Sequence, residues 1–456
     1  MNKHAVKLFG CVAAASLAAV VVAPGSVRAA SVTFGTPTAK VTFGKSIVYT
    51  QPISGSSFAA ADIVITTAGD LTPSAHAIEQ ADSSTLTFTY DNTSTGPFEP
   101  IDAFFQVIFD DGTIQQGPSV HIVNTDSRFT WQTKSSGLLT IHYLQGSDSF
   151  VNQLLDYGVK GMSKSASFFG ITETKKVDFY IYPSSSVFTQ GLNVPDTIGG
   201  QARPEYRTCF AEISPGDLGY ASQVIPHELT HVAFSDAVDN PYGSQPDWLN
   251  EGLAVYLSQG YDSSDRNLVK QAAKSGKLLP LATFRAYFFL DSNRIYQSYA
   301  EAVSAVDFLI RKYGEGSVQK LLKAYHAGST DEEAFQSALG VTPDAFDKAW
   351  MADNGVTLPA AYGPQPAPTG ALPPGWTNDG SAGSTSQPGA SQPPAAETAS
   401  PGASGTAGPS ATTSGGTVND PTSTVLLVCA AVGAIGVLLL IVAGVLNSQE
   451  RRRLNP

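Results

Sequence analysis

The sequence of 456 residues contains few cysteines and few basic residues, and each shortage excludes a class of protein. Cys11 and Cys429 lie in apolar segments near the two ends, so only Cys209 remains in the part that can fold. An intramolecular disulfide is therefore excluded there. Lysine and arginine number 27 against 39 acidic residues, and the one basic run is 451–453. Nucleic-acid binding requires clustered positive charge, so this composition argues against a nucleic-acid partner.

The N-terminus has the pattern of a secretory signal peptide. Lys3 and Lys7 precede an uncharged apolar stretch at 8–23, and small residues follow as far as Ala30. A short charged region, an apolar core and small residues at the cleavage point define such signals. The sequence therefore predicts that residues 1–30 are a signal peptide and that the remainder is exported.

The C-terminal part of the sequence predicts a linker and a membrane anchor. Residues 358–423 are mainly Pro, Ser, Thr, Gly and Ala, a composition that buries too little apolar surface to fold. Residues 424–446 are apolar and, at about 1.5 Å per residue, long enough to cross a hydrocarbon core of about 30 Å as one helix. The basic tail 447–456 then stays in the cytoplasm by the positive-inside rule. We expect a single-pass protein of the cell membrane whose N-terminal part is extracellular.

Residues 31–125 have the pattern of a small all-β domain. Short β-branched and aromatic runs alternate with turn residues throughout this stretch. At 85–90, Leu86, Phe88 and Tyr90 alternate with threonines, which places the apolar side chains on one face. The pattern predicts an Ig-like β-sandwich without catalytic residues.

Residues 126–357 predict an α+β domain. Strand patterns at 138–143 and 177–182 flank an apolar-periodic helix at 149–169, and from Tyr220 onward helical patterns dominate. We therefore expect an α+β fold class with a mostly helical second half.

A His-Glu-Leu-Thr-His motif at 227–231 is the sharpest chemical signal in the chain. Positions i and i+4 share one helix face, so His227 and His231 can present ring nitrogens to one metal ion with Glu228 beside them. A catalytic zinc site takes protein ligands at all positions but one, which is left for water. Glu251 follows His231 by 20 positions in a second helical pattern and is the natural third ligand.

Two residues near the motif predict local structure. Pro226 directly precedes the motif and lacks a backbone N–H, which predicts that the helix begins only shortly upstream. Cys209 lies in a strand pattern at 208–213, where a small packed residue is a better interpretation than a reactive thiol.

The motif at 227–231 and the Trp-Leu-Asn-Glu-Gly-Leu-Ala segment at 248–254 together resemble the gluzincin metallopeptidases. Within that clan the chain is most similar to the bacterial peptidase MA-like domains, from about residue 129 to about residue 354. The resemblance implies a thermolysin-like catalytic domain within 126–357 and, with the stalk and anchor, a bacterial source. It implies one Zn²⁺ per chain held by His227, His231 and Glu251, with Glu228 as general base.

The resemblance implies a peptide or protein substrate and hydrolysis by activated water. Water bound to zinc has its pKa lowered toward about 7, so Glu228 can take its proton and pass it to the leaving amine. Gluzincins also use a downstream Tyr or His to stabilise the oxyanion, for which Tyr299 is favoured over Tyr296 and His326. Asn250 is a candidate supporting residue beside the third ligand.

Several alternatives stay open. The chain lacks a Gly-x-Met-Glu-Asn-like element before the zinc motif, which favours endopeptidase over aminopeptidase cleavage without settling it. The segment 199–202 followed by 208–213 can form an edge strand for an extended substrate. A wall peptide cross-link is one conceivable substrate. The main alternative is a catalytically inactive or latent surface binding or adhesin protein that retains the zincin fold.

Overall fold

The computed structural model describes residues 30–70, 72–78, 84–194, 198–240, 245–284, 288 and 294–357. These residues form two compact units: the first extends to Trp131, and the second takes most of the chain from Gln132 onward. Nearly all of the predicted signal peptide at 1–30 lies outside the described residues, as do the predicted linker, membrane helix and basic tail at 358–456. Within the described part, no helix combines the length and apolar character needed to span a membrane.

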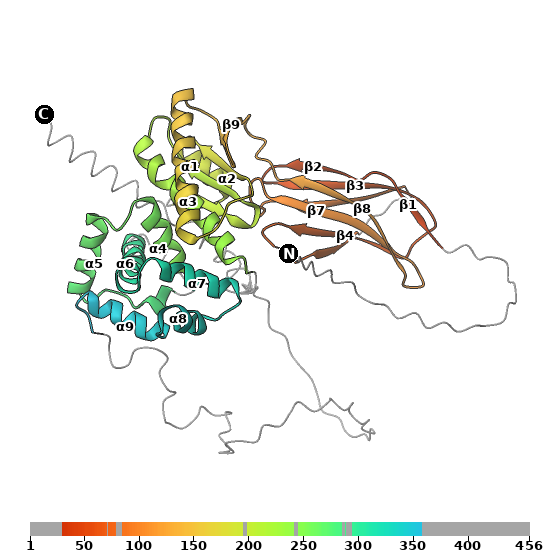
Figure 1. The fold of residues 1–456 in the computed structure, drawn as a ribbon. Helices are drawn as coiled ribbons and strands as arrows, with labels where there is room; N and C mark the ends of the chain where they lie inside the picture. Colours follow the sequence, from red (N-terminus) through yellow and green to blue (C-terminus); the bar gives the residue numbers. More distant parts are fainter. Residues whose placement is uncertain are drawn as a thin grey trace, which may run out of the picture. The chain divides into compact units, whose positions relative to one another are not determined.

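The first unit is built from antiparallel strands, which confirms the sheet-rich N-terminal region (Figure 1). One sheet contains β1 (Val32–Phe34), β2 (Thr38–Thr42), β3 (Ser46–Gly55) and β6 (Thr85–Asp91). The other contains β4 (Ala60–Thr67), β5 (Ser74–Ala77), β7 (Pro100–Ile108) and β8 (Ile114–Val123). Alternate residues of both sheets, among them Ile47, Ile63 and Phe105, share one hydrophobic core, as the period of two in a strand requires.

The second unit begins with a mixed five-stranded sheet. Its strands are β9 (Gln132–Ser136), β10 (Leu139–Tyr143), β11 (Val177–Tyr182), β12 (Gly200–Arg203) and β13 (Thr208–Glu212), in the order β12-β13-β11-β10-β9. The strands β10, β11 and β13 run parallel, and the two outer strands pair antiparallel. One face of the sheet buries Leu139, Phe179 and Cys209 against helices. The predicted edge strand is confirmed for β12, whereas β13 lies inside the sheet between β12 and β11.

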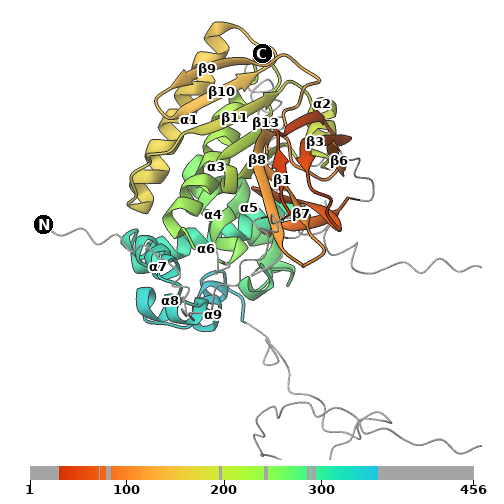
Figure 2. The same ribbon diagram turned by 90° about the vertical axis from the view of Figure 1, so that its right-hand side faces the viewer.

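Helices make up most of the second unit, which confirms the predicted α+β organisation (Figures 1 and 2). The α-helices are α1 (Asp148–Phe169), α2 (Ser185–Leu192), α3 (Leu218–Val238), α4 (Asp247–Ser258), α5 (Ser263–Lys274), α6 (Ile295–Tyr313), α7 (Gly316–His326), α8 (Asp331–Leu339) and α9 (Pro343–Asp353). Short 3₁₀ turns occur at Pro204–Tyr206 and Leu281–Phe284. Both views show α1 and α3 side by side on the sheet, and their shared core residues agree with this.

Helix α3 packs closely on α1 because α1 presents glycines at the contact. A β-carbon on Gly161 would lie 2.9 Å from Cβ of Pro226, and one on Gly158 would lie 2.2 Å from a methyl group of Leu139. Side chains at these positions would therefore force the helix away from α3 and from the sheet. The glycines allow α3, which carries the predicted metal-binding motif, to lie directly against its support.

The prediction that the motif helix begins only shortly before Pro226 is wrong, because Pro226 lies inside α3. Asp217 caps the helix by accepting a hydrogen bond from the backbone N–H of Tyr220, so the helix already begins at Leu218. The ring of Pro226 fits against Gly161, and the Thr230 hydroxyl donates to the Pro226 carbonyl at 2.7 Å. Packing against α1 thus offsets the N–H that proline lacks.

Cys209 is a packed residue, as predicted. Its side chain is fully buried on β13, and its Sγ lies 3.6 Å from the backbone carbonyl oxygen of Glu228. Burial, with the nearby charge of Glu228, raises the pKa of the thiol well above its ordinary value. The thiol is therefore neutral in the folded protein and lies between the sheet and α3.

Candidate metal centre

Helices α3 and α4 bring His227, His231 and Glu251 together in the interior. The Nε2 atoms of the two histidines are 3.2 Å apart, and the Oε2 atom of Glu251 lies 3.6 Å from each of them. The three side chains are buried, and their donor atoms all lie within 4.8 Å of one another. The three residues that the sequence selects as ligands therefore converge on one point.

The donor set and its spacing fit a zinc ion. Ligand atoms at about 2.0–2.1 Å from a tetrahedral zinc are roughly 3.3 Å apart, close to the separation of the two histidine nitrogens. Oε2 of Glu251 and Nδ1 of His227 are buried and have no hydrogen-bond partner in the described part of the chain. A buried carboxylate oxygen without a partner is costly unless a cation neutralises it. Two imidazole nitrogens and one carboxylate oxygen are the ligand types that zinc takes in catalytic sites.

The electrostatics of the cluster favour the protonation states that a metal ion requires. Burial lowers the pKa of His227, and the neighbouring His231 lowers it further, so its ring is neutral at pH 7. Burial alone would raise the pKa of Glu251, but the electrostatic interaction with His231 and the hydrogen bond with His227 hold it below its usual value. Neutral imidazole and ionised carboxylate are the forms that bind divalent cations.

Glu228 lies on α3 directly after His227 and has a different environment. The side chain is buried, and burial together with the charge of Glu251 raises its pKa well above the ordinary value. A carboxylate with a raised pKa accepts protons more readily near neutral pH. The structure thus places a proton acceptor beside the converging ligands.

Asn250 orients one of the histidines. Its Oδ1 lies 2.9 Å from Nδ1 of His231, where it accepts the ring N–H. With the proton held on Nδ1, the lone pair on Nε2 points toward His227 and Glu251. The supporting position that the sequence suggests for Asn250 is therefore where the structure places it.

Of the three residues considered for oxyanion stabilisation, Tyr299 reaches the cluster. Its ring on α6 lies 6.4 Å from that of His227, and the side chain is buried. Burial and the charges of Glu251 and Glu228 raise the pKa of the phenol, which places it near both carboxylates. Tyr296 stays partly exposed three positions earlier on α6. His326 instead has its Nδ1 2.8 Å from the carbonyl oxygen of Val238, the last residue of α3.

Two polar residues near the metal centre, Asp247 and Tyr220, are not predicted from the sequence as part of the site. Asp247 lies one helical turn before Glu251 on α4, and burial with the charge of Glu251 raises its pKa to about 7. Tyr220 lies two turns before His227 on α3, and burial with the charge of Glu228 raises the pKa of its phenol. Helical spacing from the ligands is the signal that would have found both residues.

Comparisons with known proteins agree with the local geometry. The peptidase MA superfamily matches residues 157–354, a stretch that contains the three converging ligands. No curated protein matches the sequence.

Among solved structures, the chain is similar to an aminopeptidase N family protein from Idiomarina loihiensis, with a TM-score of 0.38 and 10% identity over 67% of this chain and 73% of that chain. It is also similar to an M1 zinc metallopeptidase from Deinococcus radiodurans, with a TM-score of 0.36 and 13% identity over 72% of this chain and 92% of that chain. The family match over residues 157–354 confirms the resemblance to the peptidase MA-like domains found in the sequence.

Proposed function

We propose that the chain is a zinc-dependent peptidase that hydrolyses peptide bonds with water. The observation that carries the proposal is the convergence of His227, His231 and Glu251 within 4.8 Å, with the buried Glu228 beside them. The match of residues 157–354 to the peptidase MA superfamily supports the same conclusion. All the groups that metal-assisted hydrolysis requires are present in this part of the chain.

Each residue of the centre then has a chemical task. When bound by the two histidines and Glu251, zinc supplies Lewis-acid activation of water and of the substrate carbonyl. Glu228 accepts the proton of the attacking water and delivers it to the leaving amine, a task that suits its raised pKa. The Tyr299 phenol donates a hydrogen bond to the oxygen on which negative charge develops. Burial of these side chains excludes bulk water and strengthens each of these interactions.

Strand β12 offers a place for the substrate backbone. It forms the outer strand of the five-stranded sheet, so one side of its backbone is free of strand partners within the described residues. An extended peptide can add to such an edge by main-chain hydrogen bonds. Binding along the length of a strand suits cleavage within a chain and supports endopeptidase action.

Export and anchoring of this domain belong to the same proposal and are supported by sequence patterns. The signal at 1–30 directs the chain outside, and the helix at 424–446 holds it at the cell membrane. The linker 358–423 then acts as a stalk between the peptidase domain and the membrane.

The test compares the purified full chain with its Glu228→Gln variant. Zinc is measured by elemental analysis, and cleavage of a mixed peptide library is followed by mass spectrometry. We expect one zinc per chain in both proteins and cleavage by the wild type alone, because Glu228 acts on water rather than on the metal. Zinc without cleavage in either protein would favour the latent binding protein. Absence of zinc from both would contradict the metal centre itself.

A further inference from the structure

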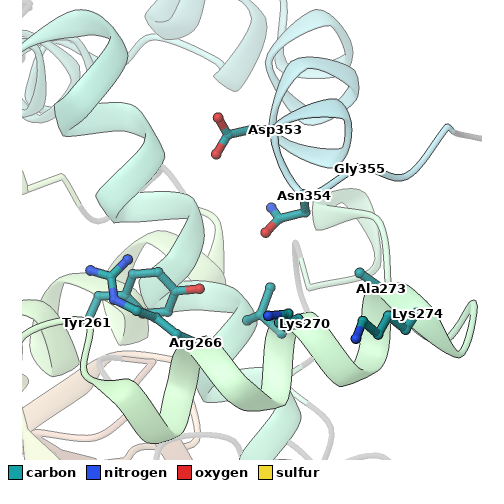
Figure 3. A pocket seen from close by; sticks show the side chains of 9 residues that line it. Tyr261, Arg266, Lys270, Ala273, Lys274, Asp353, Asn354 and Gly355 are labelled. Carbon is teal, nitrogen blue, oxygen red and sulfur yellow. The ribbon is translucent and has the colours of Figure 1, made fainter.

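A second feature of the helical half is a cleft of about 370 Å³ between α5 and the end of α9 (Figure 3). Arg266, Lys270 and Lys274 of α5 line one side, and Asn354 and Gly355 line the other. None of these residues belongs to the metal centre, and nothing in the proposed reaction uses them. The volume lies within the range of about 300–1,000 Å³ that is usual for ligand sites.

The cations that line this cleft, Arg266, Lys270 and Lys274, are here called the α5 cations. Their positions differ by four residues, so they lie on one face of the helix, and Figure 3 shows them on the side that faces Asn354. Lys270 and Lys274 are exposed, and neither has an ion pair among the described residues. The guanidinium of Arg266 lies 4.1 Å from the ring centroid of Tyr261, which holds it in place.

The carboxylates near the cleft are already paired with another cation. Asp307 accepts from Nε of Arg311 at 2.7 Å and lies 3.9 Å from Nη2 of Arg266. Asp353, which also lines the cleft, accepts from Nη2 of Arg311 at 2.7 Å. Arg311 thus shares the charge of both carboxylates, and the lysines of the α5 cations stay uncompensated. Such a cluster stands out in a chain with a formal net charge of −12.

The spacing of the α5 cations suits an extended peptide. Four residues of helix rise about 6 Å, so the three positions span about 12 Å. In an extended strand, side chains at alternate positions point the same way and are roughly 6.6–6.8 Å apart. Three acidic side chains at alternate positions of a peptide can therefore face the three cations in register.

Asn354 adds a feature that favours a peptide over a phosphate polymer. Its Nδ2 donates to the carbonyl oxygen of Trp350 at 2.9 Å, which leaves Oδ1 without a partner in the described part of the chain. That oxygen can accept a hydrogen bond from a backbone N–H, a donor that a phosphate polymer lacks. Asp353 on the same wall also disfavours a ligand with a charge on every repeating unit.

We propose that this cleft binds an acidic segment of a peptide in extended conformation and thereby holds substrates for the peptidase domain. The binding itself is independent of catalysis, whereas its use as a substrate-holding site rests on the proposed function. The α5 cations pair with acidic side chains at alternate positions, and Asn354 contacts the peptide backbone.

The binding test uses the full chain carrying Glu228→Gln, so that no probe is cleaved. Fluorescence anisotropy measures the dissociation constant of a labelled Ser-Glu-Ser-Glu-Ser-Glu-Ser peptide. Two further labelled peptides serve as probes. One has the same composition but carries its three glutamates at consecutive positions, and the other has glutamine in place of each glutamate. The binding variant is Lys270→Gln with Lys274→Gln. Lys320→Gln with Lys323→Gln removes the same charge from exposed positions of α7 and is the matched control.

We expect the alternating peptide to bind most tightly, the glutamine peptide not to bind, and added salt to weaken binding. Loss of both lysines should weaken it about fivefold to tenfold, the effect of two solvent-exposed ion pairs, and the control should change it less than about twofold. Equal weakening in the two double variants would overturn the proposal. Tighter binding of polyphosphate, with the same dependence on Lys270 and Lys274, would also overturn it by identifying a phosphate site.

Catalysis is tested separately with the wild type and a cleavable peptide that carries the acidic segment at one end. The proposal expects the acidic segment to lower KM without a change in kcat, and the loss of Lys270 and Lys274 to abolish this advantage. Cleavage with a KM that is independent of these lysines would overturn the substrate-holding role while leaving the peptidase intact. Tight binding without any cleavage would instead mean that the proposed function fails, and the substrate-holding role with it.

Discussion

Gly252 and Ala302 are in backbone contact: a β-carbon on Gly252 would lie 2.5 Å from the carbonyl oxygen of Ala302. No side chain fits in this space, so α4 lies directly against α6. Glu251 precedes Gly252, and Tyr299 lies one helical turn before Ala302. The contact therefore fixes the distance between the third ligand and the phenol that faces it.

Gly252→Ala should destabilise the protein and weaken metal binding. The added methyl group forces α4 away from α6, at a cost of about 1–3 kcal/mol in the free energy of unfolding, and displaces Glu251. Gly316→Ala on α7 is the matched control, because a β-carbon there meets nothing within 4 Å. Urea unfolding and zinc titration of both variants check this. A Gly252→Ala protein with wild-type stability and zinc affinity would show that the contact does not set the helix spacing.

Asn250→Ala should lower zinc affinity while the fold is retained. The variant removes the acceptor for the N–H of His231, so the ring is free to rotate and to change tautomer. Loss of such a supporting hydrogen bond costs about 10–100-fold in metal affinity. Competition with a coloured chelator measures the effect, and Asn267→Ala at an exposed position of α5 is the control. Unchanged affinity in Asn250→Ala would contradict the orienting role.

Tyr299→Phe should lower kcat without loss of zinc. The hydroxyl is not one of the three converging donor atoms, so its removal leaves the metal ligands in place. If the phenol stabilises the oxyanion, kcat falls about 10²–10³-fold and KM changes little. Tyr296→Phe, on the same helix, is the control. A loss of activity in Tyr296→Phe instead of Tyr299→Phe would transfer the role to Tyr296.

Glu301→Gln should make the stability of the protein less sensitive to a rise in pH from about 5 to about 8. Burial raises the pKa of Glu301 to about 8 from 4.5, so the folded state retains a proton that the unfolded state has lost. Wild-type stability therefore falls as pH rises from about 4.5 to about 8, by up to about 1.4 kcal/mol per pH unit. Glutamine carries no titrating proton, so the stability advantage of the variant grows over this window and is constant above it.

Urea unfolding at several pH values between 5 and 9 measures this difference in the free energy of unfolding. Glu332→Gln removes an exposed glutamate from α8 and controls for the change in net charge. The difference in the free energy of unfolding between Glu301→Gln and the wild type should therefore vary with pH. If it does not, Glu301 is ionised in the folded protein, and interactions with its neighbours offset the cost of burying its charge.

Local periodicity accounts for the parts of the fold that the sequence predicts. The alternation at 85–90 appears as β6, and the i and i+4 spacing places His227 and His231 on one face of α3. The third ligand depends on the way α4 packs on α3, so periodicity makes Glu251 a candidate by its position in a second helix but does not predict its contact with the histidines. Tertiary contacts between helices determine the parts of the fold and of the site that periodicity does not predict.

Two findings show where local patterns fail. Pro226 lies inside α3 because Gly161, from a different helix, accommodates its ring. The cleft between α5 and α9 combines Arg266 with Asn354, which are far apart in the chain. Both arrangements depend on residues that are far apart in the sequence. A local sequence pattern, which covers one helix at a time, therefore cannot predict them.

Cys209 gives the protein a natural reporter of movement in the layer formed by β13 and α3. Its thiol is fully buried and contacts the carbonyl oxygen of Glu228, so an alkylating reagent reaches it only when α3 separates from the sheet. The rate at which Cys209 is labelled, located by peptide mapping, therefore measures how often that layer opens in the folded protein. Metal binding by α3 and α4 should slow the labelling, since it ties the moving helix to its neighbour.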